Sequence, residues 1–277
     1  MPIETKGADK AGKQYWENTW AEGELPKAVN QFQSGLNDYV TLCFHRYFRG
    51  IFSKIETQGM KLLEIGCARS VWLPYFAKEF GFVVNGLDYS EKGCSLTRQI
   101  LNNEGVKGEV VCVDFFSPPK YMLGGFDVVV SFGVAEHFQG TAECLSAFSK
   151  LLKDGGIIIT IVPNMTGLIG YVQRIMNRPV YDIHVPLDRE LLYAAHKQSG
   201  LDVIECDYFL STNFGVINLD GISQKTLGTK KEILRILVGL SKAIWLFEMR
   251  LGHLAVSKCM SPYIKCLSRK PKGHHYL

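Results

Sequence analysis

Short apolar runs of strand length alternate with helix-length amphipathic segments through the centre of the chain, and this alternation restricts the folds open to it. Most of the runs are apolar at nearly every position, as in strands buried on both faces of a parallel sheet whose connections are helices. We therefore expect an α/β protein with a doubly wound sheet. The expected strands lie at residues 61–65, 81–87, 109–113, 126–131, 157–162, 203–210 and 263–267, and the expected helices at 71–80, 91–103, 141–152 and 188–199.

Three segments do not fit the alternation, and they define the expected domain organisation. Residues 1–58 precede the first strand and form an expected N-terminal helical extension that acts as a lid. Residues 59–271 form one main domain, with cap insertions at about 163–187 and 212–255. The insertion at 163–187 follows the carboxyl end of a strand, where doubly wound sheets bind ligands, so we expect it to cover a pocket.

Composition and charge exclude several classes of protein. The chain has 277 residues, of which 47% are apolar and 21% charged, which is typical of a packed globular protein rather than a disordered one. The net charge is only +4 and no dense basic stripe accompanies it, so we expect no nucleic-acid partner. The eight cysteines include no C-x-x-C pair, which predicts buried reduced thiols in a cytoplasmic protein and no metal site. The oligomeric state stays open.

A strongly apolar segment at residues 231–251 is interrupted by charges and shows helical periodicity. Its apolar positions are Ile233, Leu237, Leu240, Ile244, Phe247 and Leu251. We interpret it as an amphipathic helix that packs on the domain through this stripe. Docking on a membrane surface is the alternative that the pattern leaves open.

The first expected strand ends in an acidic residue followed by small ones, in the stretch Glu64-Ile65-Gly66-Cys67-Ala68-Arg69-Ser70. The small residues allow a ligand to approach the backbone closely. The stretch is not the dinucleotide fingerprint G-x-G-x-x-G, because the third glycine is absent and Glu64 would repel a pyrophosphate. A nicotinamide-dependent dehydrogenase is therefore the less favoured alternative, and a ligand with a cationic end is favoured.

Acidic residues also follow the next strands. Asp88 lies 22 residues beyond Gly66, close to the spacing at which an acid accepts hydrogen bonds from ribose hydroxyls. Asp114, at the third strand's end, could accept from an adenine amino group, and Phe115 or Tyr89 could cover the ring face. A Glu-His pair, Glu136-His137, follows the fourth strand.

Together these stretches resemble the class I S-adenosylmethionine-dependent methyltransferases that act on small molecules. The similar stretches are LLEIGCARS, GLDYS, VCVDFF, FDVVVSFGVAEHF and LLKDGGIIITIVPN over roughly residues 60–165, with SPYIKCLSRKP at 261–271 as the last strand. The resemblance implies a Rossmann-like seven-stranded sheet with six parallel strands and one antiparallel strand. The family's glycine-rich loop is altered here, since Ala68 and Ser70 replace glycines.

The resemblance also implies roles for individual residues toward S-adenosylmethionine. Glu64 and Gly66 would hold its methionine end, and Asp88 would bind its ribose diol. Ala68 and Tyr89 are further expected cofactor contacts. Asp114 and Phe115 would face adenine. Ser131 and Val134 would line the floor below the sulfonium. Tyr15, Trp16 and Trp20 look like the tryptophan-bearing N-terminal helix that closes over the cofactor in several small-molecule methyltransferases, with ordinary aromatic packing as the alternative.

Methyl transfer is an in-line displacement that needs alignment, exclusion of water and, for a protonated acceptor, a base. Histidine suits the base role, which makes His137 the first candidate and His184 the second. Glu136, Tyr181, Tyr15 and Trp16 are the candidate substrate contacts. We expect O-methylation of a small molecule without a metal. An N- or S-methyltransferase, or a methyltransferase-like scaffold without turnover, remains the alternative.

Overall fold

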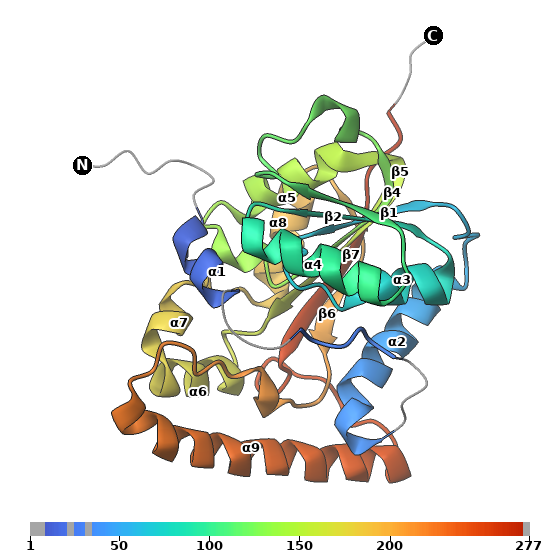
Figure 1. The fold of residues 1–277 in the computed structure, drawn as a ribbon. Coiled ribbons are helices and arrows are strands. Elements are labelled where there is room, and N and C mark those ends of the chain that lie inside the picture. The colour runs from blue at the N-terminus through green and yellow to red at the C-terminus, as the bar shows by residue number, and fades with distance from the viewer. Residues whose placement is uncertain (1–8, 21–24, 31–34, 274–277) are drawn as a thin grey trace.

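A computed structural model of the protein describes residues 9–20, 25–30 and 35–273 and contains one seven-stranded sheet. Its strand order is β3-β2-β1-β4-β5-β7-β6, with β7 antiparallel to both of its neighbours (Figure 1). The strands are β1 (Lys61–Ile65), β2 (Val83–Asp88), β3 (Gly108–Cys112), β4 (Phe126–Phe132), β5 (Leu152–Pro163), β6 (Asp202–Phe209) and β7 (Tyr263–Arg269). The predicted fold, six parallel strands and one antiparallel strand, is confirmed.

Helices cover both faces of this sheet (Figure 1). The described helices are α1 (Lys13–Thr19), α2 (Tyr39–Phe52), α3 (Trp72–Phe80), α4 (Glu91–Asn103), α5 (Thr141–Leu151), α6 (Leu168–Met176), α7 (Arg178–Asp182), α8 (Arg189–Gln198) and α9 (Gln224–Leu251). Short 3₁₀ turns lie at Leu36–Asp38, Lys120–Met122, Ala135–His137 and Phe214–Val216. None of the described helices is apolar over a stretch long enough to cross a bilayer.

Alternate residues of the central strands supply the two halves of the core, because side chains point to opposite faces along a strand. Leu62 and Val128 pack on one face with the phenylalanines of α2 and with α3. Leu63 and Val129 pack on the other face with α5 and α8. Burial on both faces explains why these strands are apolar at nearly every position.

The N-terminal extension divides into two parts with different roles. Helix α2 belongs to the core, since Phe48 and Phe52 are buried against α3. Helix α1 instead lies at the edge of the sheet beside α4 (Figure 1). The core position of α2 therefore contradicts the expectation of a single lid over residues 1–58, and a lid role for α1 stays a prediction. Residues 1–8, 21–24 and 31–34 of this extension lie outside the described residues.

Both predicted insertions are helical and lie at the carboxyl-end edge of the parallel strands. The first contains α6 and α7 and follows β5, and the second contains α9 and follows β6. Of the 28 residues of α9, only Ser241, Trp245 and Glu248 are buried. The structure thus contradicts the expectation that the periodic apolar stripe packs on the domain, because Leu240 and Phe247 of that stripe are exposed.

All eight cysteines of the chain are free thiols in the structure. Cys43, Cys67, Cys94, Cys144 and Cys266 are buried and Cys206 is half-buried. Cys112 and Cys259 are exposed, so the expectation of buried thiols holds for most of them but not for these two.

Candidate functional site

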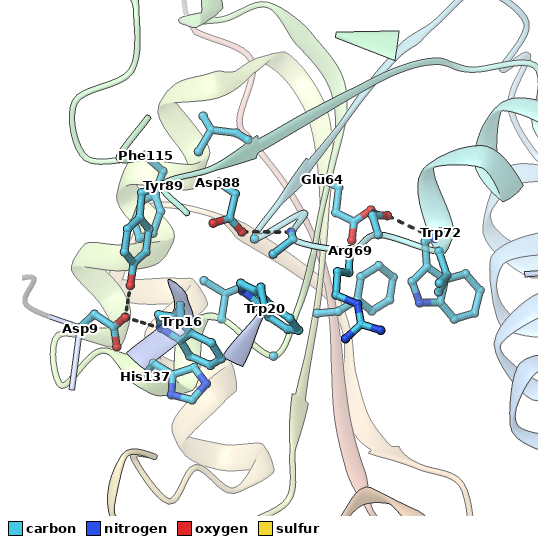
Figure 2. Close-up of a pocket in the computed structure, with 18 of the residues that line it drawn as sticks. Asp9, Trp16, Trp20, Glu64, Arg69, Trp72, Asp88, Tyr89, Phe115 and His137 are labelled. Atoms are coloured by element: carbon cyan, nitrogen blue, oxygen red, sulfur yellow. Dashed lines mark hydrogen bonds between the residues drawn. The ribbon is translucent and has the colours of Figure 1, made fainter. Parts of the chain in front are cut away.

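A cavity with about 910 Å³ of space, counted out to its open mouth, lies at the carboxyl ends of β1, β2 and β4 under α1. Figure 2 shows how its side chains converge from these elements. It brings together many of the residues predicted from the sequence: Trp16, Trp20, Glu64, Gly66, Ala68, Asp88, Tyr89, Phe115, Val134 and His137. It also includes residues to which the sequence analysis gave no role: Asp9, Arg69, Ser70, Val71, Trp72, Leu87, Phe132, Gly133 and Phe138.

The loop after β1 turns sharply against β4. Gly66 has φ +77°, and a Cβ at this position would lie 2.3 Å from Cγ2 of Val134. Glycine is therefore required here both for its backbone conformation and for the close approach. Arg69 also adopts a left-handed conformation, with φ 54°, which is uncommon for a residue with a side chain.

Ser70, which replaces a loop glycine, connects this loop to both the strand and the following helix. Its Oγ donates a hydrogen bond to Oε2 of Glu64 at 2.5 Å and accepts one from the backbone N–H of Leu73 at 3.1 Å. A serine that accepts from the first turn of a helix stabilises its start. Burial raises the pKa of Glu64 to about 8, although the bond from Ser70 opposes this shift. The Glu64 carboxyl is therefore ready to ionise when a cation approaches.

Asp88 ends β2 with both carboxyl oxygens directed at backbone amides. It accepts from Ala68 N–H at 3.1 Å and from Ser90 N–H at 2.8 Å. Burial raises its pKa to about 6, and these two bonds act in the opposite direction. At neutral pH the group is a fixed, ionised acceptor between the loop after β1 and the start of α4.

Asp9 closes the cavity from the N-terminal side, and no sequence motif pointed to it. Its carboxylate accepts from Nε1 of Trp16 at 2.7 Å and from the hydroxyl of Tyr89 (Figure 2). Its neighbour Lys10 donates its backbone N–H to the carbonyl of His137 at 2.9 Å. These bonds join the segment before α1 to the ends of β2 and β4, so α1 covers the cavity.

His137 and His184 lie against each other, with ring centroids 4.6 Å apart. Nδ1 of His137 lies 3.0 Å from the carbonyl of Ile183, and Nδ1 of His184 lies 2.7 Å from that of Val180. A carbonyl only accepts, so both Nδ1 atoms carry the proton and both Nε2 atoms keep a lone pair. Only His137 lines the cavity, while His184 lies behind it.

The pKa values of both histidines are lowered. Burial is the main reason that the pKa of His137 is lowered. Burial, followed by the nearby His137, lowers the pKa of His184 to about 4. Trp16 lies edge-on to His137 with centroids 4.9 Å apart. His137 is therefore a neutral, oriented imidazole at neutral pH.

Several predicted site residues lie elsewhere. Asp114 lines an adjacent cavity that shares Asp9, Tyr89, Phe115 and Phe138 with the first. Ser131 is fully buried below the surface of the cavity. Glu136, Tyr15, Tyr181 and His184 do not line the described cavity. Tyr181 lies instead under the guanidinium of Arg174, which is 5.9 Å from the ring centroid.

Glu136, His137 and His184 offer a set of possible metal ligands. One ligand atom from each lies within 4.8 Å of the others, and Oε2 of Glu136 has no hydrogen-bond partner in the described structure. Imidazole and carboxylate are ligands that Zn²⁺ accepts. The absence of a metal therefore stays a prediction.

Buried groups with shifted pKa values predict that the protein is most stable at mildly acidic pH. Burial raises the pKa of Glu64 and of Glu136 from 4.5 to about 8, so their stabilisation, complete below pH 4.5, is lost as the pH rises to about 8. Burial lowers the pKa of His184 to about 4 and of His196 to about 3, so their stabilisation, complete above pH 6.5, is lost as the pH falls. Each group changes the free energy of unfolding by about 1.4 kcal/mol per pH unit within its window.

Thermal unfolding across pH tests this prediction. The melting temperature should pass through a maximum between pH 4.5 and 6.5, where the two opposite contributions overlap. The variant Glu136→Gln should flatten the alkaline side and leave the acidic side unchanged. A melting temperature that rises steadily up to pH 8 would contradict the protonated state of the buried glutamates.

The fold and the cavity together define a class of protein. A sheet of this order with an antiparallel β7, and acids that end β1 and β2 at one cavity, are the features of a class I S-adenosylmethionine-dependent methyltransferase. The profile of a methyltransferase domain family matches residues 41–205. The chain belongs to this family, and its cofactor is S-adenosylmethionine.

Similar proteins include enzymes with different acceptors. A ubiquinone biosynthesis O-methyltransferase of Thiobacillus denitrificans is 25% identical over 167 residues, which are 57% of this chain and 71% of that one. EEF1A lysine methyltransferase 2 of Danio rerio is 28% identical over 126 residues, 44% of this chain and 52% of that one.

Solved structures share the fold at low sequence identity. Phosphoethanolamine N-methyltransferase 2 of Haemonchus contortus superposes with a TM-score of 0.60 at 15% identity, over 98% of this chain and 61% of that one. Geranyl diphosphate C-methyltransferase of Streptomyces coelicolor superposes with a TM-score of 0.55 at 14% identity, over 93% and 96% of the two chains.

Proposed function

We propose that the protein transfers a methyl group from S-adenosylmethionine to an oxygen atom of a small molecule, with His137 as the base. The proposal rests on the position of the His137 imidazole and on which of its nitrogens carries the proton. Its Nδ1 is committed to the Ile183 carbonyl, and the ring lines the cavity with Nε2 unprotonated. A neutral, fixed imidazole is suited to take a proton from a hydroxyl acceptor.

The cofactor would lie across the ends of β1 and β2. Asp88 would accept from the ribose hydroxyls, and Glu64 would ionise against the ammonium group of the methionine end, which favours its charged form. The adenine would extend past Tyr89 and Phe115 toward Asp114 in the adjacent cavity. Gly66 and Ala68 leave room for the ligand beside the loop backbone.

S-adenosylmethionine supplies an electrophilic methyl group on a positively charged sulfur. Val134, with the buried Ser131 beneath, would form the floor that orients this end of the ligand. His137 would accept the proton of the acceptor hydroxyl at Nε2 while the new O–CH₃ bond forms and the S–CH₃ bond breaks. Trp16 and Trp20 would exclude water from this step, since they close the cavity from the side of α1.

A small acceptor agrees with the apolar lining of the cavity, which Trp16, Trp20 and Phe138 help to form beside α1. The ubiquinone, phosphoethanolamine and geranyl diphosphate methyltransferases are named for small acceptors, whereas the EEF1A enzyme is named for a lysine. His184 would support His137 from behind rather than contact the acceptor. Glu136, Tyr15 and Tyr181 are less suited to bind substrate than the sequence suggested, because they do not line the cavity.

Two measurements test the proposal. Calorimetry should show binding of S-adenosylhomocysteine and none of NAD, which separates a methyltransferase from a dehydrogenase. Transfer of a labelled methyl group should then be measured on panels of phenols, sugars, amines and thiols. Turnover restricted to amines or thiols would contradict O-methylation, and binding without turnover on any panel would favour a scaffold.

The bonds of Asp9 predict that α1 responds to the cofactor as a lid. Amide hydrogen exchange at Trp16 and Trp20 should slow when S-adenosylhomocysteine is added, because lids come from the less stable parts of a structure. The variant Asp9→Asn, which weakens the bonds to Trp16 and Tyr89, should exchange faster in both states. Amides of α5 in the core serve as the control. Equal exchange with and without ligand would indicate ordinary packing of α1.

A further inference from the structure

The outward face of α9 carries a continuous apolar stripe. With about 100° between successive residues, positions three and four apart lie on one face of a helix. Ile236 and Leu251 are 73% and 72% exposed. The exposed apolar residues at this spacing are Ile233, Ile236, Leu240, Phe247 and Leu251. They extend along a helix of 28 residues, about 42 Å long.

The opposite face of α9 is already bound to the domain. Trp245 donates Nε1 to the carbonyl of Thr212 at 2.9 Å and stacks on Tyr39 with centroids 5.5 Å apart. Oε2 of Glu248 accepts from the hydroxyl of Tyr39 at 2.8 Å. The polar groups of Trp245 and Glu248 therefore have hydrogen-bond partners in the domain. Rotating the helix to bury the outer stripe would break these hydrogen bonds and the ring contact with Tyr39. Figure 1 shows α9 along the lower margin of the molecule, with α6 and α2 on its inner side only.

The charge of the protein is concentrated on this helix. Residues 224–251 contain six Lys and Arg and two Glu, a net charge of 6 − 2 = +4. The whole chain has 31 basic and 27 acidic residues, also +4, so the remaining residues have 25 of each and no net charge. Of the two acids, Glu248 is buried, and Glu232 is paired with Arg235 at 2.8 Å.

We propose that α9 docks the protein on an anionic membrane surface, with the apolar stripe in the interface and Lys225 and Arg250, which flank the stripe, among the lipid headgroups. A helix of this kind, with an exposed apolar face bordered by cations, lies in the plane of the bilayer surface. The helix does not span the membrane, since its charges interrupt every long apolar window. Pairing with a second copy is opposed, because the same excess of positive charge would face itself across the contact.

Co-sedimentation of the full chain with vesicles tests the docking. The protein should bind vesicles of phosphatidylcholine mixed with phosphatidylglycerol, bind pure phosphatidylcholine vesicles much more weakly, and dissociate at high salt. The variant Leu240→Glu should lose binding. The matched control is Leu191→Glu on α8, because the two leucines are 50% and 53% exposed in the native protein.

A charge variant tests the second half of the proposal. Replacing Lys225 and Arg250, the two exposed cations that flank the stripe, by Gln should lower the vesicle partition coefficient about fivefold for each cation removed, and so about twenty-five-fold in total. Replacing Lys231 and Lys242, on the opposite side of the helix, should lower it less. Affinity for S-adenosylhomocysteine should stay unchanged in every variant, which shows that each is folded and separates this proposal from the proposed methyl transfer. Failure of the native protein to bind anionic vesicles would overturn the docking, as would a dimer that Leu240→Glu dissociates.

Discussion

Replacing His137 with Ala should lower kcat by about 10²–10⁴-fold, the usual contribution of general-base catalysis. The affinity for S-adenosylhomocysteine should change little, because His137 is placed toward the acceptor rather than the ribose or the methionine end. The matched control is His45→Ala, since His45 lies outside the cavity and pairs with the hydroxyl of Tyr75 at 2.9 Å. Added imidazole should restore part of the activity of the Ala variant. Near-native turnover of His137→Ala would favour an acceptor that is already deprotonated.

The pH dependence of kcat follows from the same histidine. The base acts when unprotonated, and burial lowers its pKa below the ordinary 6.5. The rate should therefore stay level from neutral pH downward and fall only below pH 6.5, as the imidazole becomes protonated. This acid limb should be absent in His137→Ala. An acid limb centred at or above 6.5 would assign the ionisation to another group.

Removal of metal distinguishes general-base catalysis by His137 from a metal-assisted reaction at Glu136, His137 and His184. Dialysis against EDTA should leave kcat unchanged, because Nε2 of His137 is expected to bind the acceptor proton and not a cation. Loss of activity that Zn²⁺ or Mg²⁺ restores would instead assign Glu136, His137 and His184 to a metal site. Imidazole would then fail to rescue His137→Ala.

Asp88→Ala should weaken S-adenosylhomocysteine binding by about a hundredfold or more. Hydrogen bonds to a charged group contribute about 1.5–3 kcal/mol each, and two ribose hydroxyls would lose their acceptor. The control is Asp202→Ala, which removes an exposed acid paired with Lys197 at the start of β6, far along the sheet order from β2. Isothermal calorimetry measures the affinity, and circular dichroism verifies the fold. An unchanged affinity would remove Asp88 from the cofactor site.

The order of strands and helices in the main domain could be predicted because it depends on local patterns. Runs such as Ile157 to Val162 are apolar throughout since both faces of the sheet are covered, and helices show their period within a dozen residues. Strand limits were less predictable. β5 begins at Leu152, earlier than the apolar run, because its first residues pair with Phe126 across a register shift.

The strand-end acids and Gly66 could also be assigned from sequence. In a parallel sheet the carboxyl ends of neighbouring strands meet at one edge, so Glu64 and Asp88 had to lie near each other once the strand order was inferred. Gly66 is fixed by the turn itself, which has a left-handed φ and no space for a Cβ.

Tertiary structure alone decided which distant residues complete the site. Asp9 reaches Tyr89 across 80 residues of sequence, and His137 meets the Ile183 carbonyl across 46, contacts that no local pattern encodes. Tertiary contacts also decide that the apolar stripe of α9 faces outward. The helix has apolar residues on two faces, and only the partners of Trp245 and Glu248, Thr212 and Tyr39, determine which face is buried. Periodicity gives the shape of a helix, but its orientation depends on what packs against it.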